Sequence, residues 1–146
     1  MAKKSYQEQM RNSYPNYPQI RPISKSMLKT WGEGRDVWVH PLEIYELMKM
    51  IPKGEVISAV EICEYFAKKH EVEMANPYVV GILMNIVAHA IEEDESDTTP
   101  WWRTVGSKNE LKSKYPNAPE EQMALLEAEG FSFVKKGKKN VYWVVV

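Results

Sequence analysis

Apolar residues recur at helical spacing in three consecutive segments in the middle of the chain. In the first, Ile44, Leu47, Met48 and Ile51 stand at positions i, i+3, i+4 and i+7 and form one apolar stripe. Pro41, which lies one turn ahead of this stripe, suits the first position of a helix because that position needs no backbone N–H donor. The pattern predicts an amphipathic helix that begins at Pro41.

Two further helices are predicted after it, each with its own cap. The Ser58 hydroxyl can accept a hydrogen bond at the start of the second helix, and Glu61 completes a capping box. Asn76 and Pro77 combine a cap with a first-turn proline at the start of the third. The expected buried face of the third helix consists of Val80, Leu83, Met84, Val87 and Ile91. Two short capped helices joined by a brief loop, after an earlier helix, are typical of a helix-turn-helix.

Beyond residue 99 the pattern changes to shorter elements. Residues 101–105 alternate as a short strand does, and residues 117–130 predict a fourth helix that stops at Gly130. The last sixteen residues predict a β-hairpin with a lysine-rich tip, KKGKK at 135–139. The fold class predicted is therefore mainly α with small β: a winged helix-turn-helix-like domain with a C-terminal β-hairpin.

The N-terminal part of the chain has a different composition. Residues 1–30 are polar, contain several Tyr and Pro and have few aliphatic side chains, which predicts an extended arm that is poorly ordered unless something docks it. A chain of 146 residues is long enough for one core. We therefore predict a basic, flexible arm over residues 1–35 and a single winged-helix domain over residues 36–146.

Composition excludes several classes of protein. Apolar residues make up 44% and charged residues 27% of the chain, which is ordinary for a globular protein, and no apolar run approaches the ~20 residues of a membrane span. A single cysteine and the lack of an apolar export signal predict a cytoplasmic protein. The three His and Cys63 lack metal-ligand spacing, so we expect neither a metal nor a cofactor.

Charge is distributed unevenly. Lys and Arg outnumber Asp and Glu in residues 1–35 and 100–146, whereas acids outnumber bases in residues 36–99. Basic segments can neutralise DNA phosphates, but they can also serve only to keep a chain soluble. The charge pattern therefore leaves the class of partner open.

Four motifs in a fixed order carry a family resemblance. They are IPKGEVIS at 51–58, VVG at 79–81, PWWRTVGS at 100–107 and LLEAEG at 125–130. In this order they resemble the DNA-binding domain of the O6-alkylguanine-DNA alkyltransferases, and more closely the alkyltransferase-like proteins. The resemblance covers roughly residues 41–133.

The resemblance implies binding without catalysis. Alkyltransferases carry Pro-Cys-His-Arg, whose thiolate accepts the alkyl group with help from the His and a Glu. Trp101 and Trp102 stand at the Cys and His positions, while Arg103 and Glu129 match the Arg and the Glu. An indole cannot accept an alkyl group as a thiolate does. Alkyltransferase-like proteins, which also have Trp at the Cys position, bind alkylated guanine flipped out of double-stranded DNA and flag it for nucleotide excision repair.

The same resemblance assigns site residues and partners. The implied lesion pocket comprises Pro100, Trp101, Trp102, Arg103 and Glu129, and the implied DNA-binding residues are Tyr78, Gly81, Asn85, Ser107, Lys108 and Lys114. Tyr78 stands where the family has an Arg that fills the gap left by the flipped base, and Ser107 matches a phosphate-contacting Ser. The implied partners are alkylated double-stranded DNA and nucleotide excision repair proteins, with no membrane.

Two alternatives remain open at the level of sequence. Trp101 is either a pocket wall that packs against an extruded base or a core residue. The predicted third helix has no Lys or Arg, and Ala59 replaces a Tyr of the family, so the chain could instead be a winged-helix interaction or regulatory module. Such a module would have lost lesion recognition and would bind a protein partner or undamaged DNA.

Overall fold

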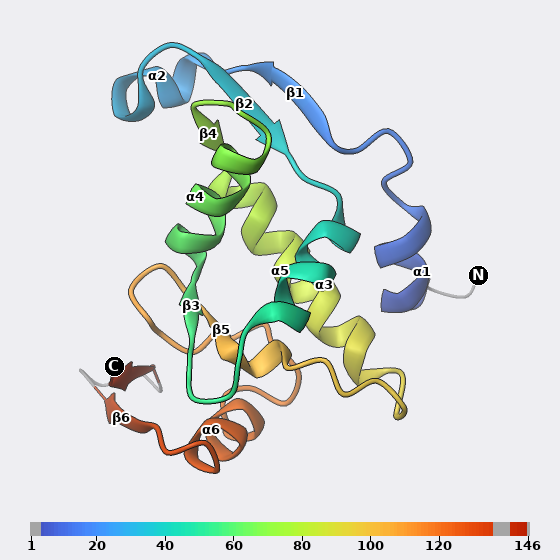
Figure 1. The fold of residues 1–146 in the computed structure, drawn as a ribbon, viewed down its shortest axis with the longest axis vertical. Coiled ribbons are helices and arrows are strands. Elements are labelled where there is room, and N and C mark those ends of the chain that lie inside the picture. Colours follow the sequence, from blue (N-terminus) through green and yellow to red (C-terminus); the bar gives the residue numbers. More distant parts are fainter. Residues whose placement is uncertain (1–3, 136–140, 146) are drawn as a thin grey trace.

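The long helix α5 (Pro77–Glu92) runs through the middle of the molecule, as the computed structural model of residues 4–135 and 141–145 shows (Figure 1). Helices α1 (Tyr6–Asn12), α3 (Pro41–Met50) and α4 (Ala59–Lys69) pack around it. Eight of its residues are buried, because neighbours cover it on several sides rather than along a single stripe. The main core of the protein therefore centres on α5.

The three central helices begin where the sequence predicts, and their caps explain why. The Nδ1 atom of His40 accepts a hydrogen bond from the Leu42 N–H at 3.0 Å at the start of α3. Ser58 and Glu61 form the predicted capping box of α4. The Asn76 side chain accepts hydrogen bonds from the first two N–H groups that follow Pro77 in α5. These caps satisfy backbone donors that the first turn of a helix leaves free.

The N-terminal region differs from the predicted extended arm. Helix α1 lies against α5, and Met10 is completely buried between them and α3. The Tyr6 ring stacks on His89 of α5 at 4.5 Å, and the Glu93 carboxylate accepts hydrogen bonds from the Tyr6 and Gln7 N–H groups. Tertiary contacts stabilise this short helix, which would be marginal on its own.

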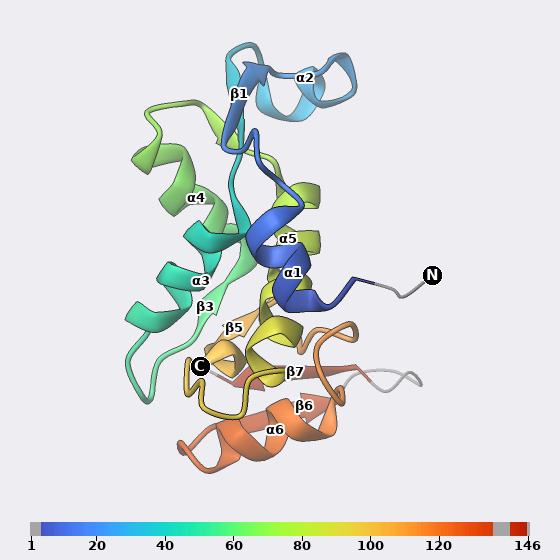
Figure 2. The same ribbon diagram turned by 90° about the vertical axis from the view of Figure 1, so that its right-hand side faces the viewer.

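The rest of this region adds a small sheet. Strand β1 (Gln19–Pro22) pairs antiparallel with β2 (Arg35–Trp38), and β2 pairs parallel with β4 (Met74–Ala75), which leads directly into α5. A short helix, α2 (Lys25–Trp31), connects β1 and β2 at the upper end of the molecule (Figure 2). The N-terminal segment is thus joined to the start of α5 by backbone pairing.

The strand predicted for residues 101–105 is wrong in its first half. Trp101–Arg103 form a single 3₁₀ turn, η1, and only β5 (Thr104–Val105) is a strand, parallel to β3 (Ile57–Ser58). The Thr104 hydroxyl donates to the Trp101 carbonyl at 2.7 Å and closes the turn. The alternation of residue types along 101–105 does not reflect alternating burial, because the neighbours Thr104 and Val105 are both buried.

The C-terminal elements follow the predicted order and confirm a mainly α fold with small β. Helix α6 (Glu120–Glu127) is shorter than predicted, and Gly130 follows it with the positive φ typical of a helix stop. Strands β6 (Ser132–Lys135) and β7 (Tyr142–Val145) form the predicted antiparallel hairpin. Most of its lysine-rich tip lies outside the described residues. The winged-helix assignment itself stays a prediction.

Among the described residues, no helix is long and apolar enough to span a bilayer.

Candidate functional site

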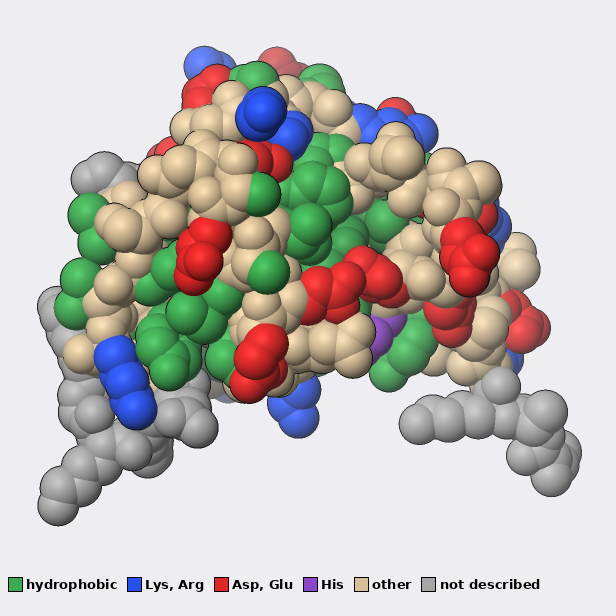
Figure 3. All heavy atoms as spheres, turned by 90° about the horizontal axis from the view of Figure 1, so that it is seen from below, with side chains coloured by type: hydrophobic (Ala, Val, Ile, Leu, Met, Phe, Trp, Pro, Cys, Tyr) green, Lys and Arg blue, Asp and Glu red, His purple; other side chains and the backbone are tan. Residues whose placement is uncertain are grey.

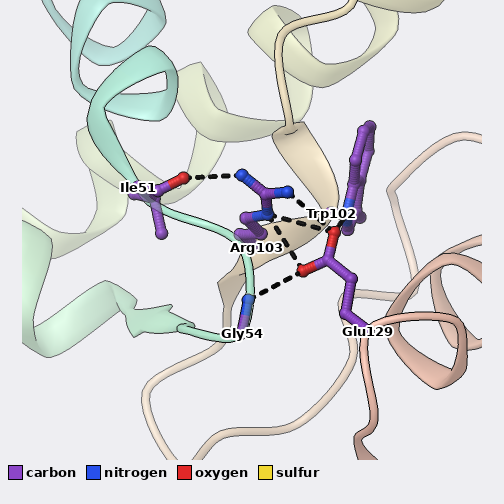
Figure 4. A network of polar contacts seen from close by, with 5 residues as sticks. All are labelled: Ile51, Gly54, Trp102, Arg103 and Glu129. Atoms are coloured by element: carbon purple, nitrogen blue, oxygen red, sulfur yellow. Dashed lines mark hydrogen bonds and ion pairs between the residues drawn. The ribbon is translucent and has the colours of Figure 1, made fainter.

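Glu129, just after α6, is hydrogen-bonded to two other segments of the chain, the loop after α3 and the η1 turn (Figure 4). Its carboxylate accepts hydrogen bonds from Trp102 Nε1 at 2.7 Å, from Arg103 Nε at 3.0 Å and Nη2 at 2.9 Å, and from the Gly54 N–H at 3.3 Å. Arg103 also donates through Nη1 to the Ile51 carbonyl at 2.7 Å. The structure thus brings together three of the residues predicted for the lesion pocket.

The electrostatics of this network favour a charged carboxylate. Burial by itself raises the pKa of Glu129, but the hydrogen bonds from Arg103 and Trp102 outweigh it and hold the pKa below its ordinary value. The Arg103–Glu129 ion pair is largely removed from water. A carboxylate with both oxygens engaged is poorly placed to take up a proton as a general base. The network is therefore best suited to holding η1 in place.

Trp101 is a core residue rather than an open pocket wall. Only 1% of its surface is exposed, and its Nε1 donates to Glu92 at 3.0 Å. Its ring makes edge contacts with Trp102 at 6.0 Å and with Tyr115 at 5.6 Å. Trp101 is thus covered by the protein except where it lines the small hollow described next, and the packing of an extruded base against its ring stays a prediction.

A hollow of about 240 Å³ lies beside the two Trp residues at the C-terminal end of α5. Acidic side chains of residues 92–97, among them Asp94, Glu95 and Asp97, form much of its lining. The lower face of the molecule shows apolar recesses bordered by acidic side chains (Figure 3). Such a border repels phosphate, so this hollow is a poor entrance for DNA.

A second hollow, of about 420 Å³, lies at the other end of α5, between its first turns and the loop of residues 106–114. We call it the α5 hollow. Gly81, Ser107 and Lys114, three of the predicted DNA-binding residues, line it together with Ala59 and Pro77. The structure thus brings these residues together, although it does not join them to Trp101 or Trp102 in one cavity.

The remaining predicted DNA-binding residues lie near the α5 hollow or on its loop. Tyr78 is 73% exposed at the start of α5, and Lys108 is exposed on the loop. Asn85 lies one turn beyond Gly81, and its buried side-chain oxygen has no hydrogen-bond partner among the described residues. Pro100, the last residue of the predicted lesion pocket, lies just before η1 and lines a different, acidic recess.

Gly81 shows that the α5 hollow is open space. It stands inside a helix, where Gly costs roughly 0.5–1 kcal/mol of stability relative to Ala. A Cβ atom added at Gly81 would find no atom within 4 Å. Packing within the protein therefore gives no reason for a glycine here, whereas the close approach of a ligand does.

Sequence reasoning missed two residues of this region. Ile82 is 58% exposed one turn after Tyr78, and its apolar character outside the buried stripe of α5 was the available signal. Lys112 lines the α5 hollow half-buried, and burial lowers the pKa of its ammonium group although Glu110 acts in the opposite direction. No local pattern distinguishes Lys112 from its polar neighbours in the sequence.

The chain's single cysteine lines neither of the two hollows described above, but it does line a third, of about 140 Å³, that shares Ala59, Pro77 and Ser107 with the α5 hollow. Cys63 is buried on α4. Burial, followed by the nearby charges of Asp36 and Glu64, raises the pKa of its thiol to about 12. Among the described residues, no group of three or more His, Cys, Asp or Glu is arranged to hold a metal ion.

One protein-family model matches the central part of the chain. The family model described as "6-O-methylguanine DNA methyltransferase, DNA binding domain" matches residues 41–131, from α3 to just beyond α6. The chain therefore belongs to this family of DNA-binding domains. No match is found among curated proteins or among solved structures. Residues 4–40, which form α1, β1, α2 and β2, precede the matched segment.

Proposed function

We propose that this protein binds duplex DNA, recognises O6-alkylguanine-type lesions in extruded nucleotides and does not transfer the alkyl group. The observation that carries the proposal is the α5 hollow, with Gly81 on one side and Ser107 on the other. Both residues belong to the segment that matches a DNA-binding family. A bound but unrepaired lesion would then serve as the signal for nucleotide excision repair proteins.

The lack of a sulfur acceptor supports binding without transfer. The sequence contains one cysteine, and that thiol is buried with a raised pKa. Only the thiolate form of cysteine is an effective nucleophile. At the positions of the family's Cys and His, Trp101 is packed in the core and Trp102 is hydrogen-bonded to Glu129.

The surface around the α5 hollow supports contact with the minor groove. Tyr78 and Ile82 are exposed on α5, a helix without Lys or Arg. Proteins that bind the minor groove often insert apolar side chains between base steps. Ser107, Lys108 and Lys114 lie on or near the rim, where they can contact phosphates. The cost of extruding a nucleotide, a few kcal/mol, is smallest for a base that pairs badly.

A titration with two duplexes tests the proposal. The duplexes are identical except that one carries O6-methylguanine in place of guanine. We expect tighter binding of the lesion duplex, loss of affinity with added salt and no transfer of a labelled methyl group to the protein. The Tyr78→Ala variant should weaken binding of the lesion duplex, whereas Tyr65→Ala, an exposed Tyr on α4, should not.

Each outcome of this titration has a clear meaning. Equal affinity for the two duplexes would show that the protein does not recognise the lesion. The absence of any salt-dependent DNA binding would favour the alternative, a module that binds a protein partner. Label on the protein would show that one of its residues accepts the alkyl group and would overturn the non-enzymatic assignment.

A further inference from the structure

Lys112 is a half-buried lysine to which the proposed function assigns no role. It lines the α5 hollow, and its Nζ atom lies 5.6 Å from the centre of the Tyr115 ring. Over residues 4–135 and 141–145, no hydrogen bond or ion pair holds this ammonium group, although Glu110 is close enough to favour its charged form. A half-buried titratable group that lines a hollow and has a shifted pKa is a candidate for a function there.

We propose that Lys112 is a nucleophile that captures the aldehyde of an abasic site in DNA as an imine. The proposal rests on the proposed function in one respect, since it needs an extruded nucleotide to occupy the α5 hollow. It adds a second class of lesion and a covalent, reversible step to that site.

Hydrogen bonds hold the backbone on both sides of Lys112. The Leu111 N–H, just before it, donates to the Tyr142 carbonyl at 2.9 Å, and the Tyr115 N–H donates to the Lys112 carbonyl itself at 3.1 Å. The loop is thus fastened to β7 on one side and closed by a turn on the other. A nucleophile on a rigid loop loses less conformational freedom when it reacts.

The amine is also in a suitable chemical state. Desolvation disfavours the charged form of lysine and lowers the pKa of the Lys112 ammonium group, so more of it is neutral near pH 7 than for an ordinary lysine. Neutral lysine amines add to carbonyl groups and form Schiff bases. Lys114, which lines the same hollow with an exposed side chain, lacks this burial.

The proposed step balances without an oxidant or a reductant. The lone pair of Lys112 Nζ attacks C1′ of the ring-opened abasic sugar, and a C–N bond forms. The aldehyde oxygen then leaves as water with the two hydrogens of the amine, and a C=N bond remains. An abasic nucleotide has no base to unstack, so its extrusion is inexpensive, and the space beside Gly81 can accept its sugar.

Borohydride trapping tests this step with the full chain. The substrate is a labelled duplex with one natural abasic site, and its control carries a tetrahydrofuran analogue, which has no aldehyde. We expect a covalent protein–DNA band with the natural site alone. The band should fall at least about tenfold in Lys112→Ala and Lys112→Arg and remain in Lys68→Ala, at an exposed lysine of α4 that lines neither hollow. The Arg variant keeps the positive charge, so its DNA affinity should stay close to that of the wild-type chain.

The failures of the two proposals can be distinguished. If the wild-type chain binds DNA but gives no band, the capture by Lys112 is wrong and the proposed function stands. A band that persists in both Lys112 variants, or one that disappears equally in Lys68→Ala, also overturns the assignment to Lys112. If the wild-type chain binds neither duplex, the proposed function fails and this inference fails with it. Circular dichroism of each variant excludes loss of folding as the cause.

Discussion

Trp102 donates its indole N–H to the Glu129 carboxylate at 2.7 Å. At these two positions the alkyltransferase motif has a His and a Glu that activate a thiolate, but here the pair forms a structural clamp. The same carboxylate holds Arg103 and the backbone of Gly54, so residues from three segments meet at one charged group. In this chain the pair therefore links η1 to the segment that follows α6.

Neutralising this carboxylate should destabilise the fold. The Glu129→Gln variant leaves the Arg103 guanidinium largely buried without its counter-charge. We expect the free energy of unfolding to fall by about 3 kcal/mol, near the lower end for breaking a buried pair. Urea denaturation measures the change. The exposed Glu127→Gln is the matched control and should unfold at the wild-type midpoint; equal midpoints for both variants would contradict the clamp.

The same group predicts a loss of stability in acid. Because the pKa of Glu129 in the folded protein is lowered from its ordinary 4.5, the unfolded chain binds this proton more readily. The stabilisation by charged Glu129 is therefore complete at pH values above 4.5, the pKa in the unfolded chain. It disappears as the pH falls through the lower pKa of the folded protein. Urea midpoints measured from neutral pH downwards should drop more steeply for the wild-type chain than for Glu129→Gln. Parallel curves would show that Glu129 titrates normally.

A methyl group added at Gly81, in the α5 hollow, should raise the stability of the fold and weaken binding of the lesion duplex. Gly81→Ala adds a methyl group where no atom lies within 4 Å, so the helix should gain about 0.5–1 kcal/mol of stability. The same methyl group narrows the space for an extruded nucleotide, and binding of the lesion duplex should weaken. Thermal unfolding and a DNA titration measure the two effects. An unchanged lesion affinity would show that no nucleotide occupies this hollow.

Truncation of the Trp101 side chain should mainly reduce the stability of the fold rather than selectively weaken DNA binding. Trp101→Ala removes a fully buried ring that packs on Tyr115, and we expect a loss of about 3–5 kcal/mol in the free energy of unfolding. Urea denaturation is the measurement, and Trp31→Ala, at an exposed Trp, is the control. A stable Trp101→Ala variant with selectively weakened lesion binding would instead restore the role of Trp101 as a pocket wall.

Cys63 should be inert in the folded protein. Burial raises the pKa of its thiol to about 12, so iodoacetamide at pH 8 should leave the native chain unmodified and should alkylate it readily in urea. Mass spectrometry detects the added group. Rapid labelling of the native protein would show that the thiolate is accessible and would reopen the question of alkyl transfer.

The amino-acid sequence determined the features that depend on neighbours along the chain. The helices α3, α4 and α5 begin after the capping residues His40, Ser58 and Asn76, respectively. Each cap accepts a hydrogen bond from a residue two or three positions further along the chain, so the signal is local. The apolar periodicity of α3 and α5 and the C-terminal hairpin are local in the same sense. The ordered motifs that led to the family are also readable without a structure.

Tertiary structure alone decided what depends on groups far apart in the chain. Met10 is buried against helices that follow it by dozens of residues, so a polar segment that reads as an arm becomes a docked helix. Trp101 reads equally well as wall or core until Glu92 and Tyr115 are seen to enclose it. Gly81 and Lys112 share one hollow only because α5 and the 106–114 loop are packed side by side. The physical reason is that burial, and the pKa of a buried group, depend on all the surrounding atoms, most of which belong to residues distant in sequence.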